Sequence, residues 1–261
     1  MNPLGLALAA LAVFCAAFAV LYAVARRMDN YGIVDIAWSY AFGVFALGSV
    51  CTAPGWGVRR GLFAGMAVIW SLRLGTHLCI RVLGHHPVED VRYQRLRQNW
   101  GGRFAVKMFW FYQLQAVSVV LLGLPFIIGM RSPSPSLRPL EIAGAVLWLV
   151  AVGGEALADA QLAAFRRNPA RQGRICTDGL WRYSRHPNYF FEWLVWVAYF
   201  LFALASPWGW ITFISPAGIL FLLLRVTGIP MTEAESIRRK GDDYRRYQQT
   251  TNAFVPWLPK E

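Results

Sequence analysis

The chain has 261 residues, of which 56% are hydrophobic and only 15% are charged, and its mean hydropathy is positive. Soluble domains of this length rarely carry so little charge. The net charge of +12 could suit a nucleic acid, but the basic residues lie between long apolar runs. We therefore expect anionic lipid and an anionic cofactor as partners, and no nucleic acid. The four cysteines have no C-x-x-C spacing, so neither a disulfide nor a metal site is expected.

Seven apolar stretches approach the length of about 20 residues with which a helix crosses the hydrocarbon core. They are residues 3–25, 33–52, 62–80, 108–130, 140–164, 189–206 and 207–229. The last two meet at Ser206-Pro207, where proline predicts a turn. The first is followed directly by Arg26-Arg27, so we expect a retained helix instead of a removed signal peptide. The sequence predicts an all-α integral membrane protein whose seven spans form one domain over residues 1–261.

Lysine and arginine are distributed unevenly among the connections between these stretches. If the N-terminus is outside, the connections 26–32, 81–107 and 163–188 and the tail 230–261 face the cytoplasm and hold 20 of the 26 basic residues. The positive-inside rule therefore predicts an external N-terminus and a cytoplasmic C-terminus. A six-span arrangement would place one of the two most basic stretches on the wrong side.

Asp35 is the only charged residue in the second stretch, and Trp38 lies one turn further on the same helix face. Two interpretations stay open. The acid could cap the helix or pair with an arginine. Alternatively, its carboxyl group faces a substrate cavity, where it acts as a proton donor.

Arg73, His77 and Arg81 fall at i, i+4 and i+8, on one stripe of the third helix. A single arginine would extend to the membrane surface. Three basic groups on one face repel one another unless an anion or an acid lies between them. We therefore expect these three residues to line one wall of an anion-binding site.

Glu155, Asp159 and Arg166 share one face of the fifth stretch. They could form an internal ion pair that ties helices together. In the functional interpretation, Asp159 accepts hydrogen bonds from a ribose hydroxyl or a carboxamide, and Arg166 binds phosphate through its planar guanidinium.

Three basic side chains precede the sixth stretch, and an amide and a carboxylate open it. They are Arg182, Arg185, His186, Asn188 and Glu192. Pro187 favours a helix start at this point. This set of side chains suits a dinucleotide. The arginines would bind its phosphates, and the acids and amides would bind its ribose and nicotinamide. The chain has no G-x-G-x-x-G motif, so the site would not be a Rossmann domain.

The tail 230–261 alternates charged and aromatic residues. This composition is typical of an amphipathic helix at the membrane surface. A lid over the cofactor site is the alternative.

Five sequence segments together resemble the steroid 5α-reductase family (3-oxo-5α-steroid 4-dehydrogenases), and most of all its bacterial branch. They are residues 27–38, 70–78 and 89–93, the Leu-Trp-Arg-Tyr-Ser-Arg-His-Pro-Asn-Tyr run (180–189), and residues 252–259. The Arg-His-Pro-x-Tyr element is shared with isoprenylcysteine carboxyl methyltransferases and sterol reductases, but the combination is more specific. The resemblance implies a seven-helix bundle that binds NADPH from the cytoplasmic side of the bacterial inner membrane. We expect a monomer.

The resemblance and the charge pattern together predict the cofactor contacts. They are Arg73, His77, Arg81, Asp159, Arg166, Arg174, Tyr183, Arg185, His186, Asn188, Glu192 and Arg225. The implied reaction is reduction of the C4–C5 double bond of a 3-oxo-Δ4 steroid or a related lipid enone, with a hydride added to the β carbon.

A glutamate and a tyrosine hold the substrate oxygen in the animal members of that family. In this chain Asp35 falls in the place of the glutamate, and Trp70 falls near that of the tyrosine, where it cannot donate a phenolic hydroxyl. Tyr31 or Tyr40 is the candidate replacement. The predicted catalytic residues are Asp35, Trp38 and Tyr31.

Two other functions stay open. An isoprenylcysteine-type methyltransferase would bind S-adenosylmethionine, which lacks phosphates, so the many arginines would be in excess. A non-catalytic protein whose basic loops bind anionic lipid would not need Glu155, Asp159 and Glu192 inside the spans.

Overall fold

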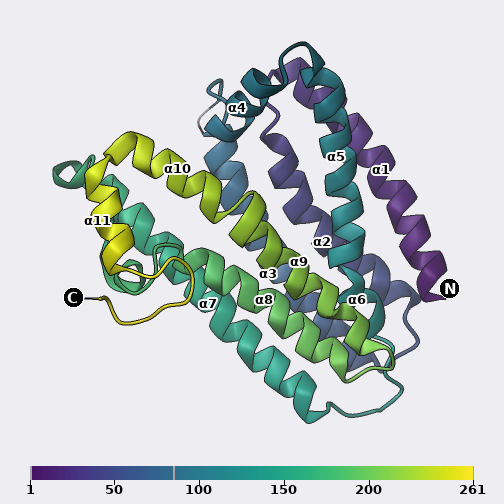
Figure 1. Ribbon diagram of the computed structural model, residues 1–261. Coiled ribbons are helices and arrows are strands. Elements are labelled where there is room, and N and C mark those ends of the chain that lie inside the picture. Colours follow the sequence, from purple (N-terminus) through teal and green to yellow (C-terminus); the bar gives the residue numbers. More distant parts are fainter. Residues whose placement is uncertain (1, 85, 261) are drawn as a thin grey trace. The chain divides into compact units, whose positions relative to one another are not determined.

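The computed structural model describes residues 2–84 and 86–260, and within these ranges it is helical and without strands (Figure 1). The same residues contain seven helices that are long and apolar enough to cross a membrane. The predicted class, an all-α integral membrane protein with seven spans, is confirmed. The external N-terminus stays a prediction, as does the single membrane domain.

The chain divides into two compact units. The first comprises residues 1–141 and 202–215, and the second comprises residues 142–201 and 216–261.

The first unit contains five long or medium helices and one short one. They are α1 (Pro3–Met28), α2 (Ile33–Thr52), α3 (Gly57–Leu83), α4 (Val91–Trp100), α5 (Phe104–Leu122) and α6 (Leu124–Gly129). Helix α2 packs along α3, and α1 packs along α5 (Figure 1). Aromatic rings fill the interior of this unit, where Phe63 stacks on Phe202 with ring centroids 4.3 Å apart.

Local sequence explains where these helices begin and end. Asn2 caps α1 by accepting a hydrogen bond of 2.6 Å from the Gly5 backbone N–H, and Pro3 occupies the first helical position. At the C-terminal end of α2, the Arg60 side chain donates to the carbonyl oxygens of Val50 (3.0 Å) and Ala53 (2.9 Å). These donors satisfy carbonyl groups that a helix end leaves without an intrahelical partner.

Two features of the first unit differ from the prediction. The stretch 108–130 is divided at Gly123 into α5 and α6, because Pro125 lacks the N–H that would continue the helix. The connection 81–107 contains α4, a ten-residue helix whose mostly polar sequence gives no hydropathy signal. The Asp90 side chain caps α4 by accepting from the Arg92 backbone N–H at 2.9 Å.

A buried ion pair fastens the loop before α7 (Pro139–Arg167). The guanidinium of Arg59 is fully buried and bonds the carboxylate of Glu141. It also donates to the backbone oxygens of Ser132 (2.9 Å), Ser134 (2.6 Å) and Ser136 (2.6 Å). One side chain thereby bonds four acceptor groups, of which Glu141 and Ser132 are buried and would be costly without a donor.

The second unit contains most of α7 and α8 (Pro187–Leu204), and then α9 (Ile214–Phe221), α10 (Ile229–Lys240) and α11 (Asp242–Thr250). The predicted span 207–229 is not one regular helix. It starts with a 3₁₀ turn at Gly209–Phe213, which belongs to the first unit, and passes through α9 into a π-helical segment at Leu222–Val226. Single π-helical turns within helices are frequent at functional sites.

The segment before α8 is fixed against α7 by two side-chain contacts. The Gln161 side chain accepts from the Leu180 backbone N–H at 2.9 Å, and the indole N–H of Trp181 donates to the Ala158 oxygen at 2.9 Å. Gly179 has φ +55° and lies against Gln161, so a side chain there would be strained and would clash. This anchoring fixes the start of the segment 179–186, which leads into α8.

Candidate functional site

In the first unit, the carboxylate of Asp35 is held by two side chains of α4. The phenol of Tyr93 donates to Asp35 Oδ1 at 2.8 Å, and Arg92 donates to Oδ2 at 2.7 Å. Tyr93 is buried, and the Asp35 side chain is 15% exposed. Of the two interpretations of Asp35, pairing with an arginine is present in the structure. The tyrosine that bonds Asp35 is one to which the sequence assigned no role.

A chain of alternating charges continues from this pair. Arg92 also bonds Asp90 at 3.1 Å, and Arg81 lies 3.8 Å from the same carboxylate. Burial by itself would raise the pKa of Asp90, but the hydrogen bonds and charge of Arg92 outweigh it and bring the pKa below its ordinary value. Asp90 therefore lies beside Arg81, which is the C-terminal member of the predicted basic stripe on α3. His77 is exposed and Arg73 is half-buried.

The other two predicted catalytic residues lie in the same unit. Tyr31 is buried, its backbone N–H donates to Glu89 at 2.9 Å, and its carbonyl accepts from the Tyr112 phenol at 2.8 Å. The indole N–H of Trp38 donates to the Ser118 hydroxyl at 2.8 Å. The contacts of Tyr31 hold the segment before α2 against its neighbours, and that of Trp38 joins α2 to α5.

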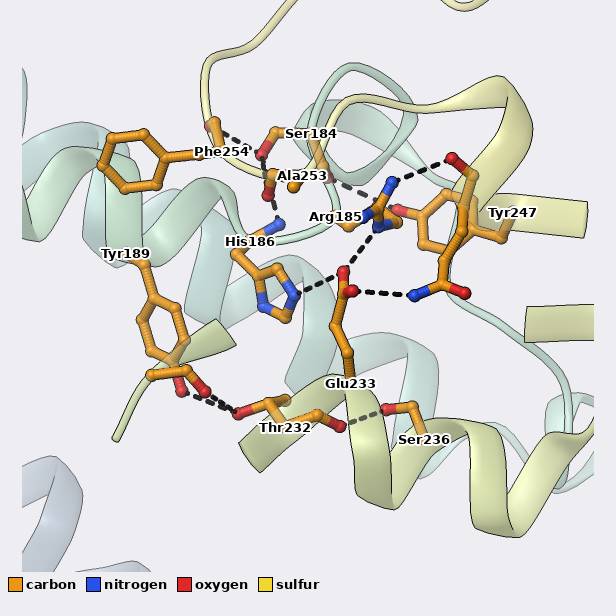
Figure 2. A network of polar contacts seen from close by, with 12 residues as sticks. Ser184, Arg185, His186, Tyr189, Thr232, Glu233, Ser236, Tyr247, Ala253 and Phe254 are labelled. Carbon is orange, nitrogen blue, oxygen red and sulfur yellow. Dashed lines mark hydrogen bonds and ion pairs between the residues drawn. The ribbon is translucent and has the colours of Figure 1, made fainter. Parts of the chain in front are cut away.

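In the second unit, the carboxylate of Glu233 on α10 is in hydrogen-bonding contact with three side chains (Figure 2). Arg185 Nε bonds it at 2.6 Å, the Gln248 amide at 2.7 Å, and His186 Nε2 lies at 3.2 Å. Arg185 donates further to the backbone oxygens of Gln248 and Thr251. Two side chains predicted to bind cofactor thus join the segment before α8 to α10 and to the end of α11.

His186 is buried, and its ring stacks on Tyr189 with centroids 5.3 Å apart. The Tyr189 hydroxyl in turn lies 3.2 Å from the Thr232 hydroxyl (Figure 2). Burial lowers the pKa of His186, and the positive charge of Arg185 acts in the same direction, against the opposing effect of Glu233. The imidazole is therefore neutral at neutral pH, and its Nε2 hydrogen is suited to point at Glu233.

The acids and amides predicted to hold ribose and nicotinamide occupy α7 and α8. The Asn188 amide donates to Asp159 Oδ1 at 3.3 Å, which joins these two predicted residues in one contact. Glu192 accepts from the Trp196 indole at 2.9 Å, within α8. Pro187 is the first residue of α8, as the sequence predicts. Glu155 lies on α7 with Asp159 and Arg166, and its side chain is buried.

The remaining predicted cofactor contacts of this unit are exposed. They are Arg166, Arg174, Tyr183 and Arg225. Arg225 stands within the π-helical segment, and the Arg174 carbonyl accepts from the Lys240 ammonium at 2.6 Å.

Sequence reasoning missed Tyr93, Arg92 and Glu233. The first two belong to the Glu-Asp-Val-Arg-Tyr segment (89–93) that carries part of the family resemblance, and this membership was a usable signal. No such signal marked Glu233, because the tail carries other acidic residues, among them Glu235, and nothing in the sequence distinguishes Glu233 from them. No groups of three or more metal-ligating side chains occur within the ranges 2–84 and 86–260.

Over the residues that the structure describes, fold and side chains define an integral membrane protein with seven apolar helices, and ionisable groups cluster around Asp35 and around Glu233. The chain belongs to the family described as "Protein of unknown function (DUF1295)", whose model matches residues 21–251. An uncharacterized protein of Schizosaccharomyces pombe is 26% identical over 270 residues, covering 92% of this chain and 76% of the relative. No solved structure matches the chain.

Proposed function

We propose that the protein is an NADPH-dependent reductase that reduces the C4–C5 double bond of a 3-oxo-Δ4 steroid or a related lipid enone. The observation that carries this proposal is the hydrogen bond from the Tyr93 phenol to Asp35, backed by Arg92. Reduction of an enone needs a proton donor at the carbonyl oxygen, and a buried phenol next to a charge-balanced carboxylate supplies one. The resemblance to the steroid 5α-reductases supplies the reaction class.

The donor set of the second unit fits a dinucleotide in its chemistry. Arg166, Arg174 and Arg225 offer exposed guanidinium groups for phosphates, and Asn188 and Asp159 pair an amide with a carboxylate for ribose or carboxamide. When bound there, the reduced nicotinamide supplies a hydride. Arg185 and His186, which the sequence also assigns to the cofactor, support the site through Glu233.

The first unit supplies the proton chemistry. Rotation about the C–O bond redirects the phenol hydrogen of Tyr93 from Asp35 to an incoming carbonyl oxygen. As the β carbon of the enone gains a hydride, its oxygen gains negative charge, which a donor already in position stabilises most. Burial of the Tyr93 ring and the guanidinium of Arg92, 5.6 Å from the ring centroid, keep the phenol in place after its hydrogen leaves Asp35. The β carbon keeps the hydride, and the α carbon takes one proton from solvent. The oxygen returns to the carbonyl form as this happens, so a proton that it took from Tyr93 goes back to the phenol.

We further propose that the cofactor site faces the cytoplasm and that the membrane is a bacterial inner membrane, in line with the basic connections of the sequence.

Turnover in reconstituted protein tests the proposal. Protein in lipid vesicles should oxidise NADPH when a 3-oxo-Δ4 steroid is added and leave NADPH unchanged without it. In parallel, thermal unfolding is followed with NADPH and with S-adenosylmethionine. Stabilisation by NADPH supports the reductase, whereas stabilisation by S-adenosylmethionine alone, without steroid-dependent oxidation, would establish the methyltransferase in its place.

A further inference from the structure

The segment Thr251–Lys260, called the C-terminal strap below, is extended but firmly held. The Arg185 backbone N–H donates to the Asn252 oxygen at 2.9 Å, and the Ser184 hydroxyl donates to the Phe254 oxygen at 2.8 Å. The Trp257 backbone N–H donates to the Tyr183 oxygen at 2.9 Å. Figure 2 shows the part of this contact around Ser184 and Phe254. The strap therefore has a fixed position relative to the segment that leads into α8.

The contacts of Phe254 place the strap beside the start of a membrane span. Its ring lies 5.6 Å from the ring of Phe190 and 5.9 Å from that of Trp193, both on α8. Since α8 begins at Pro187 and rises 1.5 Å per residue, these rings lie about 5–9 Å along the helix from its start. This distance from the start of the span is comparable to the roughly 5–10 Å by which interfacial apolar groups enter the boundary between headgroups and acyl chains.

Beyond Phe254, the strap exposes large apolar side chains in succession. Val255 is 51% exposed, Trp257 67% and Leu258 71%. Together with Tyr183 and Pro256, Trp257 and Leu258 line a shallow apolar hollow. Scattered apolar residues are ordinary on a protein surface, but three in a rigidly held stretch of four positions form a patch.

Basic residues flank this patch. Arg182, next to Tyr183, and Lys260, two residues after Leu258, are both exposed. Tryptophan with basic neighbours is the combination that favours the membrane–water interface, where the apolar ring enters the boundary and the cations meet anionic headgroups. The same segment could not lie across the hydrocarbon core, because its backbone is not helical.

We propose that the C-terminal strap is an interfacial anchor. Val255, Trp257 and Leu258 insert into the headgroup boundary of the leaflet at the Pro187 end of α8, and Arg182 and Lys260 contact anionic lipid headgroups. The lipid surface thereby holds the strap, and the strap holds the backbone of Tyr183, Ser184 and Arg185. This inference does not depend on the reaction that the protein catalyses.

A spin-label experiment on the full-length chain tests the anchor. Cys15, Cys51 and Cys79 are replaced by alanine, and the buried Cys176 is kept. A nitroxide is then attached at Leu258→Cys, with Gln249→Cys on the exposed face of α11 as the matched control. In vesicles of phosphatidylcholine and phosphatidylglycerol, collisions with oxygen, which partitions into lipid, are compared with collisions with a water-soluble nickel chelate.

The anchor predicts an oxygen-to-nickel collision ratio several-fold higher at position 258 than at position 249. Equal ratios at the two positions would overturn the proposal. A second measurement needs no label. Brominated acyl chains should quench the fluorescence of the parent protein more than that of Trp257→Phe, and equal quenching of the two would also count against insertion.

Discussion

The phenol of Tyr93 donates a 2.8 Å hydrogen bond to the carboxylate of Asp35, which lies 58 positions earlier in the chain. Both side chains belong to the first unit, on α4 and α2. The same carboxylate is paired with Arg92. Asp35 thus accepts a hydrogen bond that orients the Tyr93 phenol, and the proposed proton donor is Tyr93.

Replacing Tyr93 by phenylalanine tests this assignment. Loss of a general acid typically lowers the rate by roughly 10²–10⁴-fold, so kcat with a 3-oxo-Δ4 steroid should fall within that range. Stabilisation by NADPH should stay as in the parent, because the phenol is assigned to the substrate. Tyr31→Phe is the control and should retain turnover. If Tyr31→Phe abolished turnover and Tyr93→Phe did not, the catalytic tyrosine would be Tyr31, as the sequence alone suggests.

Glu233 should determine how firmly the chain after α10 is held. Glu233→Gln removes the negative charge that Arg185 pairs with, and a hydrogen bond to a charged group contributes about 1.5–3 kcal/mol to the unfolding free energy. Thermal unfolding in detergent should show this loss, and trypsin should cleave faster at Arg245 and Arg246.

Glu235→Gln is the matched control for that change. Glu235 lies on the same helix but pairs with the exposed Arg238 and Arg239, and such surface pairs contribute below about 1 kcal/mol. Equal effects of the two substitutions would show that the Glu233 contacts carry no special weight.

The seven spans could be predicted because long apolar stretches report directly on the membrane. Helix α4 could not, since it is short and polar and gains its order from Asp90 at its start and from contacts with other helices. The partner of Asp35 was equally hidden. Arg92 and Tyr93 reach Asp35 only because the chain folds back over almost 60 residues, and no local spacing encodes that return.

The tail illustrates a second limit. Glu233 and Glu235 are two positions apart and look alike in the sequence, but two positions on a helix point to different faces. Glu233 pairs with Arg185 of the segment before α8, and Glu235 pairs with Arg238 and Arg239 on its own helix. By contrast, Asn188 and Asp159 could be singled out from the sequence because both are polar residues in apolar helices, and their side chains are in contact. Their shared role toward a cofactor stays a prediction.

Stability should depend on pH through His186. Burial lowers the pKa of this imidazole, so between its folded-state pKa and the unfolded value of about 6.5 the unfolded chain binds more protons. The stability contribution is therefore complete above about pH 6.5 and is lost as the pH falls below it. Arg185 and Glu233 are the charged neighbours in this region. Thermal unfolding is compared between about pH 7.5 and pH 5.5.

His186→Gln serves as the reference in that comparison, because glutamine can donate to Glu233 without titrating. The parent should lose more stability than this variant on acidification. Parallel loss in the two proteins would mean that other groups cause the pH dependence.

The buried pair of Arg59 and Glu141 should be the most sensitive ionic contact of the first unit. Arg59→Met leaves the Glu141 carboxylate buried without its guanidinium partner, and breaking such a pair costs about 3–5 kcal/mol. It also removes the donor to three serine carbonyls, of which that of Ser132 belongs to a buried residue. The apparent Tm in detergent should fall accordingly. The conservative variant Arg59→Lys should recover only part of the loss, because an ammonium group cannot reach all four acceptors. A Tm of Arg59→Met equal to that of the parent would contradict this account of the loop.

The proposed reaction is tested most directly by following the transferred hydrogen. Reconstituted protein is supplied with a 3-oxo-Δ4 steroid and NADPH deuterated at C4 of the nicotinamide, each epimer in turn, and the product is analysed by mass spectrometry and NMR. We predict that one epimer delivers a single deuterium to the β carbon, C5, and that deuterated water labels C4 instead. A steroid recovered unreduced, or reduced without deuterium from either epimer, would contradict the proposed hydride transfer.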